Sequence, residues 1–146
     1  GLVQVAHASS TVGVTYLTSD GESFEVKPGE ELNQAVVFKE PMLRWALPNG
    51  TDDEGPSDLF YLLLLLDPDA PQPYVKKEGN AVRHWAVSNI PSESLEHGEF
   101  GIERGWADNL YFAPRPPKGT GPHRYIFKLY EQPKANLFFG LPIDHV

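Results

Sequence analysis

The stretch LLLLLDPDAP, residues Leu62–Pro71, joins a run of five leucines directly to two aspartates that are bracketed by prolines. The apolar segment extends over Leu59–Leu66, where both alternating faces of a strand would be apolar. A strand of this kind is covered on both sides, so we predict that it is a central strand of a sheet. A buried core strand does not by itself explain the two carboxylates at its end.

The rest of the chain is divided into short segments by turn-forming residues. The 146 residues include 14 Pro and 13 Gly, which are spread throughout and favour short strands over long helices. VTYLTSDGESFEV, residues 14–26, predicts two strands around an Asp20-Gly21 turn, and SESLEHGEF, residues 92–100, predicts one short helical turn. The expected strands are Val12–Leu17, Glu22–Val26, Val36–Phe38, Met42–Ala46, Leu59–Leu66, Val82–Asn89 and Tyr125–Tyr130. Short strands at this spacing predict an all-β fold, either a sandwich or a barrel.

Length and composition limit the functions that are open to the chain. A length of 146 residues fits one domain over residues 1–146, and no apolar run approaches the ~20 residues that a membrane-spanning helix needs. The formal net charge of −8 argues against nucleic-acid binding, so any bound anion must be held by local donors. The absence of cysteine excludes disulfides and thiol catalysis.

The compartment stays open between cytoplasmic and secreted. The first residues, GLVQVAHASS, lack the charged start and long apolar stretch of a secretory signal. Asn49 begins an Asn-Gly-Thr sequon that would accept a glycan in a secreted chain, but Asn-Gly is also a common turn, which is the favoured interpretation.

The first candidate for chemistry is the Asp67–Pro71 segment. Side chains at i and i+2 of an extended segment point the same way, so Asp67 and Asp69 are expected to face one pocket. Pro68 and Pro71 would stiffen the loop that holds them. The alternative is a solvated turn in which the aspartates cap nearby N–H groups.

Two further candidates each contain a histidine. His84 lies in RHWAV, inside an expected strand, where a lone histidine is more often a satisfied core residue than a ligand. His123 and Tyr125 follow the Gly/Pro-rich segment PPKGTG, whose Gly119–Gly121 loop could bring backbone N–H groups close to a ligand. The alternative is a plain loop that enters a core strand.

An enzyme is the less favoured hypothesis. Two histidines and two carboxylates resemble a zinc or non-haem iron set, but none of the strong metal-ligand spacings occurs. The G-x-S-x-G elbow of a serine hydrolase and the Gly-rich phosphate loop of nucleotide hydrolases are both absent. We therefore expect no catalytic residue, no metal and no cofactor.

Three stretches in this order, DPDAP, RHWAVSNIP and PPKGTGPHRYIFKLYEQ, resemble the phosphatidylethanolamine-binding protein family, whose members are also called Raf kinase inhibitor-like proteins. The segments VTYLTSDGESFEV, EPMLRWALPNG and LFYLLLLLDPDAP also fall in family order, so the resemblance spans Val12–Pro133. It implies a β-sandwich of two antiparallel sheets with Greek-key connections, few short helices and a small anion pocket near one end.

The resemblance also implies the pocket residues and their ligand. By motif match they are Asp67, Asp69, His84, Tyr111, Gly121, His123 and Tyr125. The implied ligand is phosphate or the phosphorylethanolamine head of a phospholipid, and the peptide bond between Ala70 and Pro71 is expected to be cis.

Two departures from the family pattern are present. Ala113-Pro114-Arg115 replaces the usual Gly-Pro after the matched tyrosine, and Arg115 would add positive charge at the pocket rim. Relatives continue for several tens of residues past Tyr-Glu-Gln, with a helix, a final strand and a gating segment beside the pocket, whereas this sequence stops at FFGLPIDHV. Either it is a naturally short form, a processed or truncated one, or part of the molecule is elsewhere. If nothing replaces that piece, we expect a more open pocket and an exposed edge that favours self-association into a homodimer.

The chemistry of the pocket follows from its residue types. A carboxylate beside an imidazole favours the imidazolium form, so His84 and His123 would donate charge-assisted hydrogen bonds to phosphate, and binding should weaken as the pH rises. We therefore expect a non-enzymatic binding and regulatory protein for phosphate-type head groups. The alternatives are a protease or kinase inhibitor that acts through its surface, and a metal-assisted or His/Asp hydrolase.

Overall fold

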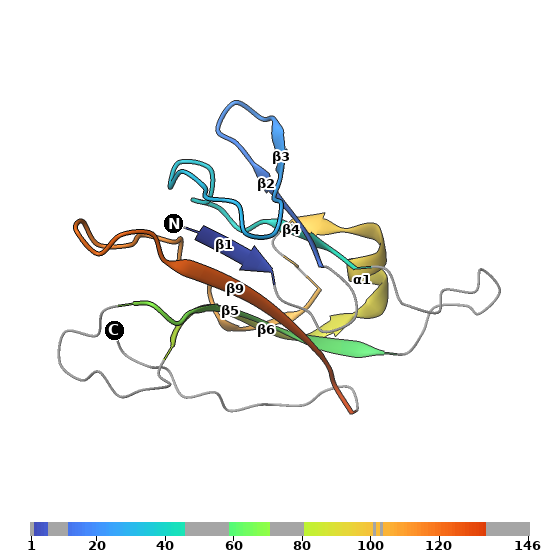
Figure 1. Ribbon diagram of the computed structural model, residues 1–146. Coiled ribbons are helices and arrows are strands. Elements are labelled where there is room, and N and C mark those ends of the chain that lie inside the picture. Colours follow the sequence, from blue (N-terminus) through green and yellow to red (C-terminus); the bar gives the residue numbers. More distant parts are fainter. Residues whose placement is uncertain are drawn as a thin grey trace.

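Strands account for nearly all of the regular structure in the computed structural model, which describes residues 2–5, 12–45, 59–70, 81–100, 102 and 104–133 (Figure 1). In chain order the elements are β1 (Leu2–Val5), β2 (Gly13–Leu17), β3 (Ser23–Glu25), β4 (Met42–Arg44), β5 (Phe60–Asp67), β6 (Val82–Pro91), α1 (Ser92–His97), β7 (Glu99–Phe100), β8 (Trp106–Asn109) and β9 (Arg124–Glu131). The expected all-β fold is confirmed, and the short helix lies where SESLEHGEF predicts a helical turn.

The strands form two sheets. One has the order β1-β9-β5-β6-β8 and the other the order β3-β2-β4-β7. Every described pairing is antiparallel except that of β1 with β9, which is parallel. In the larger sheet β5, β6 and β8 are successive neighbours and β9 returns beside β5, which is the strand order of a Greek key.

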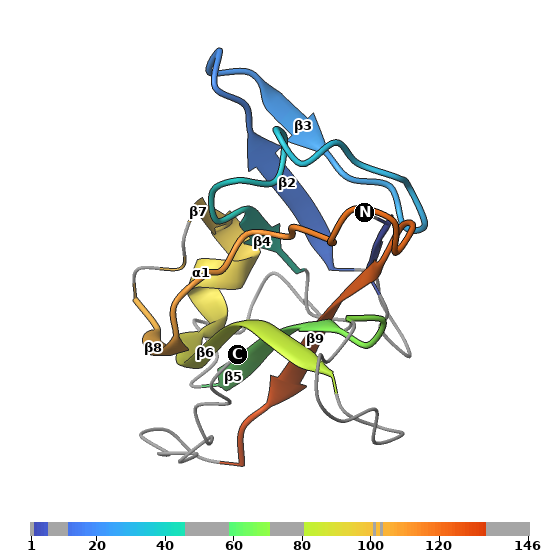
Figure 2. The same ribbon diagram turned by 90° about the vertical axis from the view of Figure 1, so that its left-hand side faces the viewer.

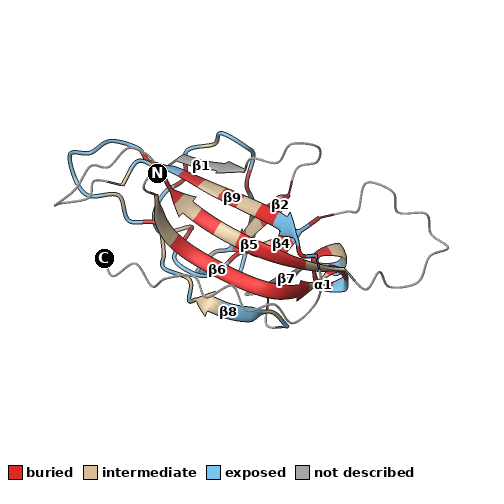
Figure 3. Cartoon of the chain, turned by 90° about the horizontal axis from the view of Figure 1, so that it is seen from below, coloured by how far each residue is buried: buried red, intermediate tan, exposed pale blue. Residues whose placement is uncertain are grey.

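Strand β5 lies in the middle of the larger sheet, between β6 and β9, as its apolar sequence predicts (Figure 3). Tyr61, Leu63 and Leu65 are buried on one face, whereas Leu64 and Leu66 on the other face are partly exposed. Asp67 lies two positions after Leu65, so its side chain points to the same buried face, and it is 2% exposed. The Asp67 carboxylate at the end of β5 therefore lies in the interior.

The core lies between the two sheets. The smaller sheet contributes Val14, Tyr16 and Leu43, and the larger sheet contributes side chains such as Leu65 and Phe127. Each of these side chains is at most 1% exposed, and burying one such apolar side chain stabilises the fold by roughly 1.5–3 kcal/mol. This packing holds the ends of β5, β6 and β9 in fixed relation to one another.

One expected strand is wrong. Residues 36–38 form a turn and bend, in which the Val36 and Val37 N–H groups donate to Asn33 and Gln34. Val37 is nevertheless buried in the core, so its apolar character signalled burial rather than strand pairing. The strand β8 was not expected, because WADN is short and contains Asp and Asn, which are depleted in strands.

Some expectations fall outside the described residues. Asn49 is among them, and so is Pro71, whose peptide bond with Ala70 was expected to be cis. Within the described residues, no helix is long and apolar enough to cross a membrane.

Candidate functional site

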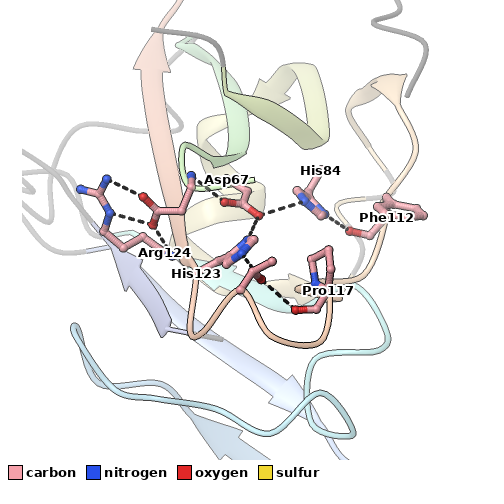
Figure 4. Close-up of polar contacts among 8 residues, drawn as sticks. Asp67, His84, Phe112, Pro117, His123 and Arg124 are labelled. Atoms are coloured by element: carbon pink, nitrogen blue, oxygen red, sulfur yellow. Dashed lines mark hydrogen bonds and ion pairs between the residues drawn. The ribbon is translucent and has the colours of Figure 1, made fainter. Parts of the chain in front are cut away.

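The candidate site lies at one end of the larger sheet, where the end of β5 meets the loop that enters β9 (Figure 4). Asp67 ends β5, and the chain then turns at Pro68-Asp69, where the Asp69 N–H donates to Asp67 Oδ1 at 2.9 Å. The other carboxylate oxygen, Asp67 Oδ2, accepts a hydrogen bond from His123 Nδ1 at 2.8 Å. His123 and Asp67 are each 2% exposed, so this hydrogen bond is buried.

His84 reaches the same carboxylate from β6. The register between β5 and β6 passes from Leu65–Trp85 to Leu66–Arg83, so His84 is an extra residue at a β-bulge. Bulges re-aim side chains and are common beside functional sites. His84 Nε2 lies 4.0 Å from Asp67 Oδ2, which places the carboxylate between two imidazoles.

The tautomer of His84 is set by a backbone carbonyl. His84 Nδ1 lies 2.7 Å from the carbonyl oxygen of Phe112, which can only accept, so Nδ1 carries a proton. Nε2 is then the nitrogen that changes its protonation state. Burial lowers the pKa of His84 from 6.5 and outweighs the opposing effects of the Phe112 carbonyl and Asp67. This corrects the expectation that the neighbouring carboxylate would raise the pKa of this imidazole.

Tyr125 packs against both histidines. Its ring makes an edge contact with His84 at a centroid distance of 5.2 Å and stacks near His123 at 6.4 Å. The residue is 1% exposed, yet its hydroxyl has no hydrogen-bond partner within the described part of the chain. Burial raises the hydroxyl pKa, and Asp67 raises it further through its charge, although no well-formed hydrogen bond joins the two groups. Among the described residues, the Tyr125 hydroxyl is therefore a donor without a well-formed hydrogen bond.

The loop before β9 engages the second nitrogen of His123. Thr120 Oγ1 donates to the Pro117 carbonyl oxygen at 2.8 Å and lies 2.8 Å from His123 Nε2. Thr120 has one hydroxyl proton, so both bonds form together only when Nε2–H is the donor. Since Nδ1 also donates to Asp67, both nitrogens then carry protons and the ring is an imidazolium. If Thr120 instead donated to Nε2, the ring would be neutral and the set would have the arrangement of a hydrolase triad.

The two carboxylates of DPDAP have different partners. Asp69 accepts from the Arg124 side chain at two oxygens, both at 2.9 Å, and from the Arg124 backbone N–H at 2.8 Å. These bonds lower the pKa of Asp69 to about 2. The turn at Pro68-Asp69 ends the extended geometry, so Asp69 pairs with Arg124 instead of lying beside Asp67. Arg124 and Thr120 were not among the predicted site residues, although both lie within the motif that drew attention to His123.

Two other predicted site residues lie at the margin of this cluster. The Tyr111 hydroxyl donates to the Val37 carbonyl oxygen at 2.6 Å and lies 3.3 Å from the Tyr16 hydroxyl, so it connects the segment after β8 to β2 of the smaller sheet and to the turn near Val37. Gly121 is exposed in the loop before His123 and has a φ of 75°, a conformation that favours glycine.

The charges of the cluster are largely compensated. Asp69 pairs with Arg124, and Asp67 pairs with His123 when that ring is an imidazolium, so an incoming anion would then meet two ion pairs rather than two bare carboxylates. The Tyr125 hydroxyl, which has no hydrogen-bond partner in the described part of the chain, and a protonated His84 could donate to it. Among the described residues, no group of three or more His, Asp or Glu side chains could hold a metal ion.

Most of the chain is similar to proteins of one known family. A family model described as phosphatidylethanolamine-binding protein matches residues 21–145. The chain is 32% identical over 125 residues to an uncharacterized protein of Saccharomyces cerevisiae, with 85% of this chain and 59% of the relative covered. It is 32% identical over 136 residues to a 26 kDa secreted antigen of Toxocara canis, with 92% and 44% covered.

A third relative carries a functional name. The chain is 27% identical over 145 residues to the carboxypeptidase Y inhibitor of Saccharomyces cerevisiae, with 92% of this chain and 64% of the relative covered. The chain thus spans between 44% and 64% of the length of these three relatives.

Proposed function

This chain belongs to the phosphatidylethanolamine-binding protein family, and we propose that it is a non-enzymatic binding protein whose pocket takes a phosphate-type head group such as phosphorylethanolamine. The observation that carries the proposal is Tyr125, whose ring packs against both imidazoles and whose buried hydroxyl has no hydrogen-bond partner among the described residues. Leaving a buried hydroxyl unpaired costs about 1–3 kcal/mol, and a phosphate oxygen that accepts its hydrogen bond would offset that cost.

The proposed binding mode assigns a role to each group. Tyr125 donates its hydroxyl to one phosphate oxygen, and a protonated His84 donates Nε2–H to another. Asp67 orients His123 through the hydrogen bond between Oδ2 and Nδ1, and in the imidazolium form of the ring the pair adds no net negative charge to the pocket. Because His84 has a lowered pKa, binding of a phosphate dianion should be accompanied by proton uptake at this residue.

The test is a calorimetric titration of the wild type, His123→Ala and His84→Gln with phosphorylethanolamine and, separately, with inorganic phosphate. We expect wild-type affinity to rise as the pH falls below 6.5, where His84 gains its proton. His84→Gln should flatten this dependence, because it removes the titrating group. His123→Ala should weaken binding at every pH, and a thermal unfolding scan of each variant verifies that it is folded.

Two results would overturn the proposal. Equal affinity of all three proteins at all pH values would remove the pocket. Turnover of p-nitrophenyl phosphate or a p-nitrophenyl ester by the wild type, abolished in Thr120→Val, would replace binding with hydrolysis through the arrangement of Thr120, His123 and Asp67.

Inhibition of a carboxypeptidase-type protease is a second candidate function. The observation that favours it is the similarity, across 92% of this chain, to the carboxypeptidase Y inhibitor of yeast. The measurement is carboxypeptidase Y activity with and without this protein. If inhibition occurs, adding phosphorylethanolamine shows whether the anion pocket and the inhibitory surface overlap, because overlap would make the two ligands compete.

A further inference from the structure

A second buried tyrosine hydroxyl lies at the other end of β5. Tyr61 is 2% exposed, and its hydroxyl has no hydrogen-bond partner among the described residues. Six positions separate Tyr61 from Asp67, which corresponds to ~20 Å along an extended strand, so this hydroxyl is remote from the candidate site. A ligand that forms a hydrogen bond with it would recover free energy that the hydroxyl loses on burial.

The first of two carboxylates beside this hydroxyl comes from β9. Glu131 is directly opposite Tyr61 in the antiparallel pairing of β5 with β9. Opposite residues of such a pair lie on the same face of the sheet, with their Cβ atoms about 4.5–5.5 Å apart. Glu131 is exposed whereas Tyr61 is buried, so the carboxylate lies beside the tyrosine at the border between the core and the solvent.

The second carboxylate comes from α1. The Ser92 N–H donates to the Leu59 carbonyl oxygen at 3.0 Å, which joins the start of α1 to the residue before β5. Residues four positions apart lie on the same face of a helix, so Glu96 shares the face of Ser92. Figure 2 shows α1 beside β4. Trp45, which follows β4, donates its N–H to the backbone of α1 at 2.9 Å, and its ring makes an edge contact with Tyr61 at 5.1 Å.

The charges of both carboxylates act on the hydroxyl. Burial raises the pKa of Tyr61 to about 12, and the charges of Glu131 and Glu96 contribute to this rise. Neither carboxylate has an ion-pair partner within the described residues. One hydroxyl oxygen and two carboxylates therefore provide three hydrogen-bond acceptors and two negative charges, a combination that a cation with N–H donors would satisfy.

We propose that Tyr61, Glu96 and Glu131 bind the ammonium group of a small primary amine. A primary ammonium has three N–H donors, of which each carboxylate accepts one in a charge-assisted hydrogen bond and the Tyr61 hydroxyl oxygen accepts the third. The two carboxylates repel a phosphate, so phosphorylethanolamine does not bind here and the ligand is an amine without an anionic group. This site goes beyond the proposed function, because it lies at the other end of β5 and takes a cation.

The test compares two cations of equal charge. Ethylammonium chloride offers three N–H donors, whereas tetramethylammonium chloride offers none. In titrations followed by two-dimensional NMR, we expect ethylammonium to bind at least ~10-fold more tightly, because only this cation can form the charge-assisted hydrogen bonds. The backbone amide signals of Tyr61, Glu96 and Glu131 should shift, and that of His123 should not.

Conservative variants identify the groups that bind the cation. Tyr61→Phe, Glu96→Gln and Glu131→Gln should each lower the affinity for ethylammonium ~10-fold or more, since each removes one acceptor or one charge. The matched controls are Tyr125→Phe, which removes the buried hydroxyl at the other end of the sheet, and Glu25→Gln, which removes an exposed carboxylate on β3 of the smaller sheet. Both controls should bind ethylammonium as the wild type does. A thermal unfolding scan verifies that each variant is folded.

Three results would overturn the proposal. They are the absence of ethylammonium binding by the wild type, equal affinity for the two cations, and a loss of affinity in the controls as large as that in the site variants. The two proposed sites fail independently. Tyr61→Phe should lose ethylammonium binding and keep phosphorylethanolamine binding, whereas Tyr125→Phe should do the reverse.

Discussion

Replacing Tyr125 by Phe removes one oxygen from the most buried part of the candidate site. The ring contacts with His84 and His123 remain, and no cavity opens because the hydroxyl is the only group lost. Two effects of opposite sign are expected. The free protein should become more stable, whereas binding of phosphate-type ligands should become weaker.

The magnitudes follow from the environment of the hydroxyl. It is buried, with 1% of the residue exposed, and has no partner within the described chain, so its removal should raise the free energy of unfolding by about 1–2 kcal/mol. For a domain of this size that corresponds to a rise in Tm of roughly 3–8 °C. A hydrogen bond to a charged ligand contributes about 1.5–3 kcal/mol, so the dissociation constant for phosphate should rise roughly 10- to 150-fold.

The assays are thermal unfolding without ligand and calorimetric titration with phosphorylethanolamine. Tyr61→Phe is the matched control, because Tyr61 is 2% exposed, its hydroxyl is also unpartnered among the described residues, and burial raises its pKa to about 12. Tyr61→Phe should raise Tm similarly and leave affinity unchanged. A Tyr125→Phe protein that unfolds at a lower temperature and binds phosphate as the wild type does would refute the reasoning.

Three further predictions concern stability. Burial lowers the pKa of His84 in the folded protein, so as the pH falls the unfolded chain binds a proton at this residue before the folded protein does. The free energy of unfolding should therefore fall as the pH drops below 6.5, and His84→Gln should flatten this decline in urea unfolding. Gln132→Ala should cost about 1–3 kcal/mol by the same measurement, because Gln132 exchanges hydrogen bonds with the backbone and side chain of buried Asn89, at 2.6 and 3.0 Å. Gly105→Ala should cost about 1–3 kcal/mol, because the added Cβ would lie 2.4 Å from Val87 Cγ1; a Tm equal to that of the wild type would contradict this packing.

Local patterns predicted most of the strands correctly. The hairpin of β2 and β3 follows from an Asp-Gly turn in which Gly21 has a φ of 83°. The leucine run correctly predicted that β5 is a central strand, but the expected cover on both faces is incomplete, because Leu64 and Leu66 are partly exposed. The same logic failed at residues 36–38, since an apolar triplet requires burial, and a turn packed on the core satisfies that requirement as well as a strand does.

The chemical types present at the site were predictable, but their partners were not. Asp67 and His123 lie 56 positions apart and meet only because β5 and β9 are neighbours. Asp69 was expected beside Asp67 and pairs instead with Arg124, because the turn at Pro68 interrupts the extended geometry. The bulge at His84 could not be predicted from the alternation of apolar and polar residues in the sequence.

By itself, the sequence determined the fold class, the central strand and the side chains that could carry chemistry, because apolar alternation, turn residues and ionisable groups are properties of local segments. Only the tertiary structure decided the direction of the His84 pKa shift and the lack of a hydrogen-bond partner for the Tyr125 hydroxyl among the described residues. Both depend on how much water and which charges surround a group after distant strands pack. Desolvation is a property of the folded interior, and no single segment of the chain specifies it.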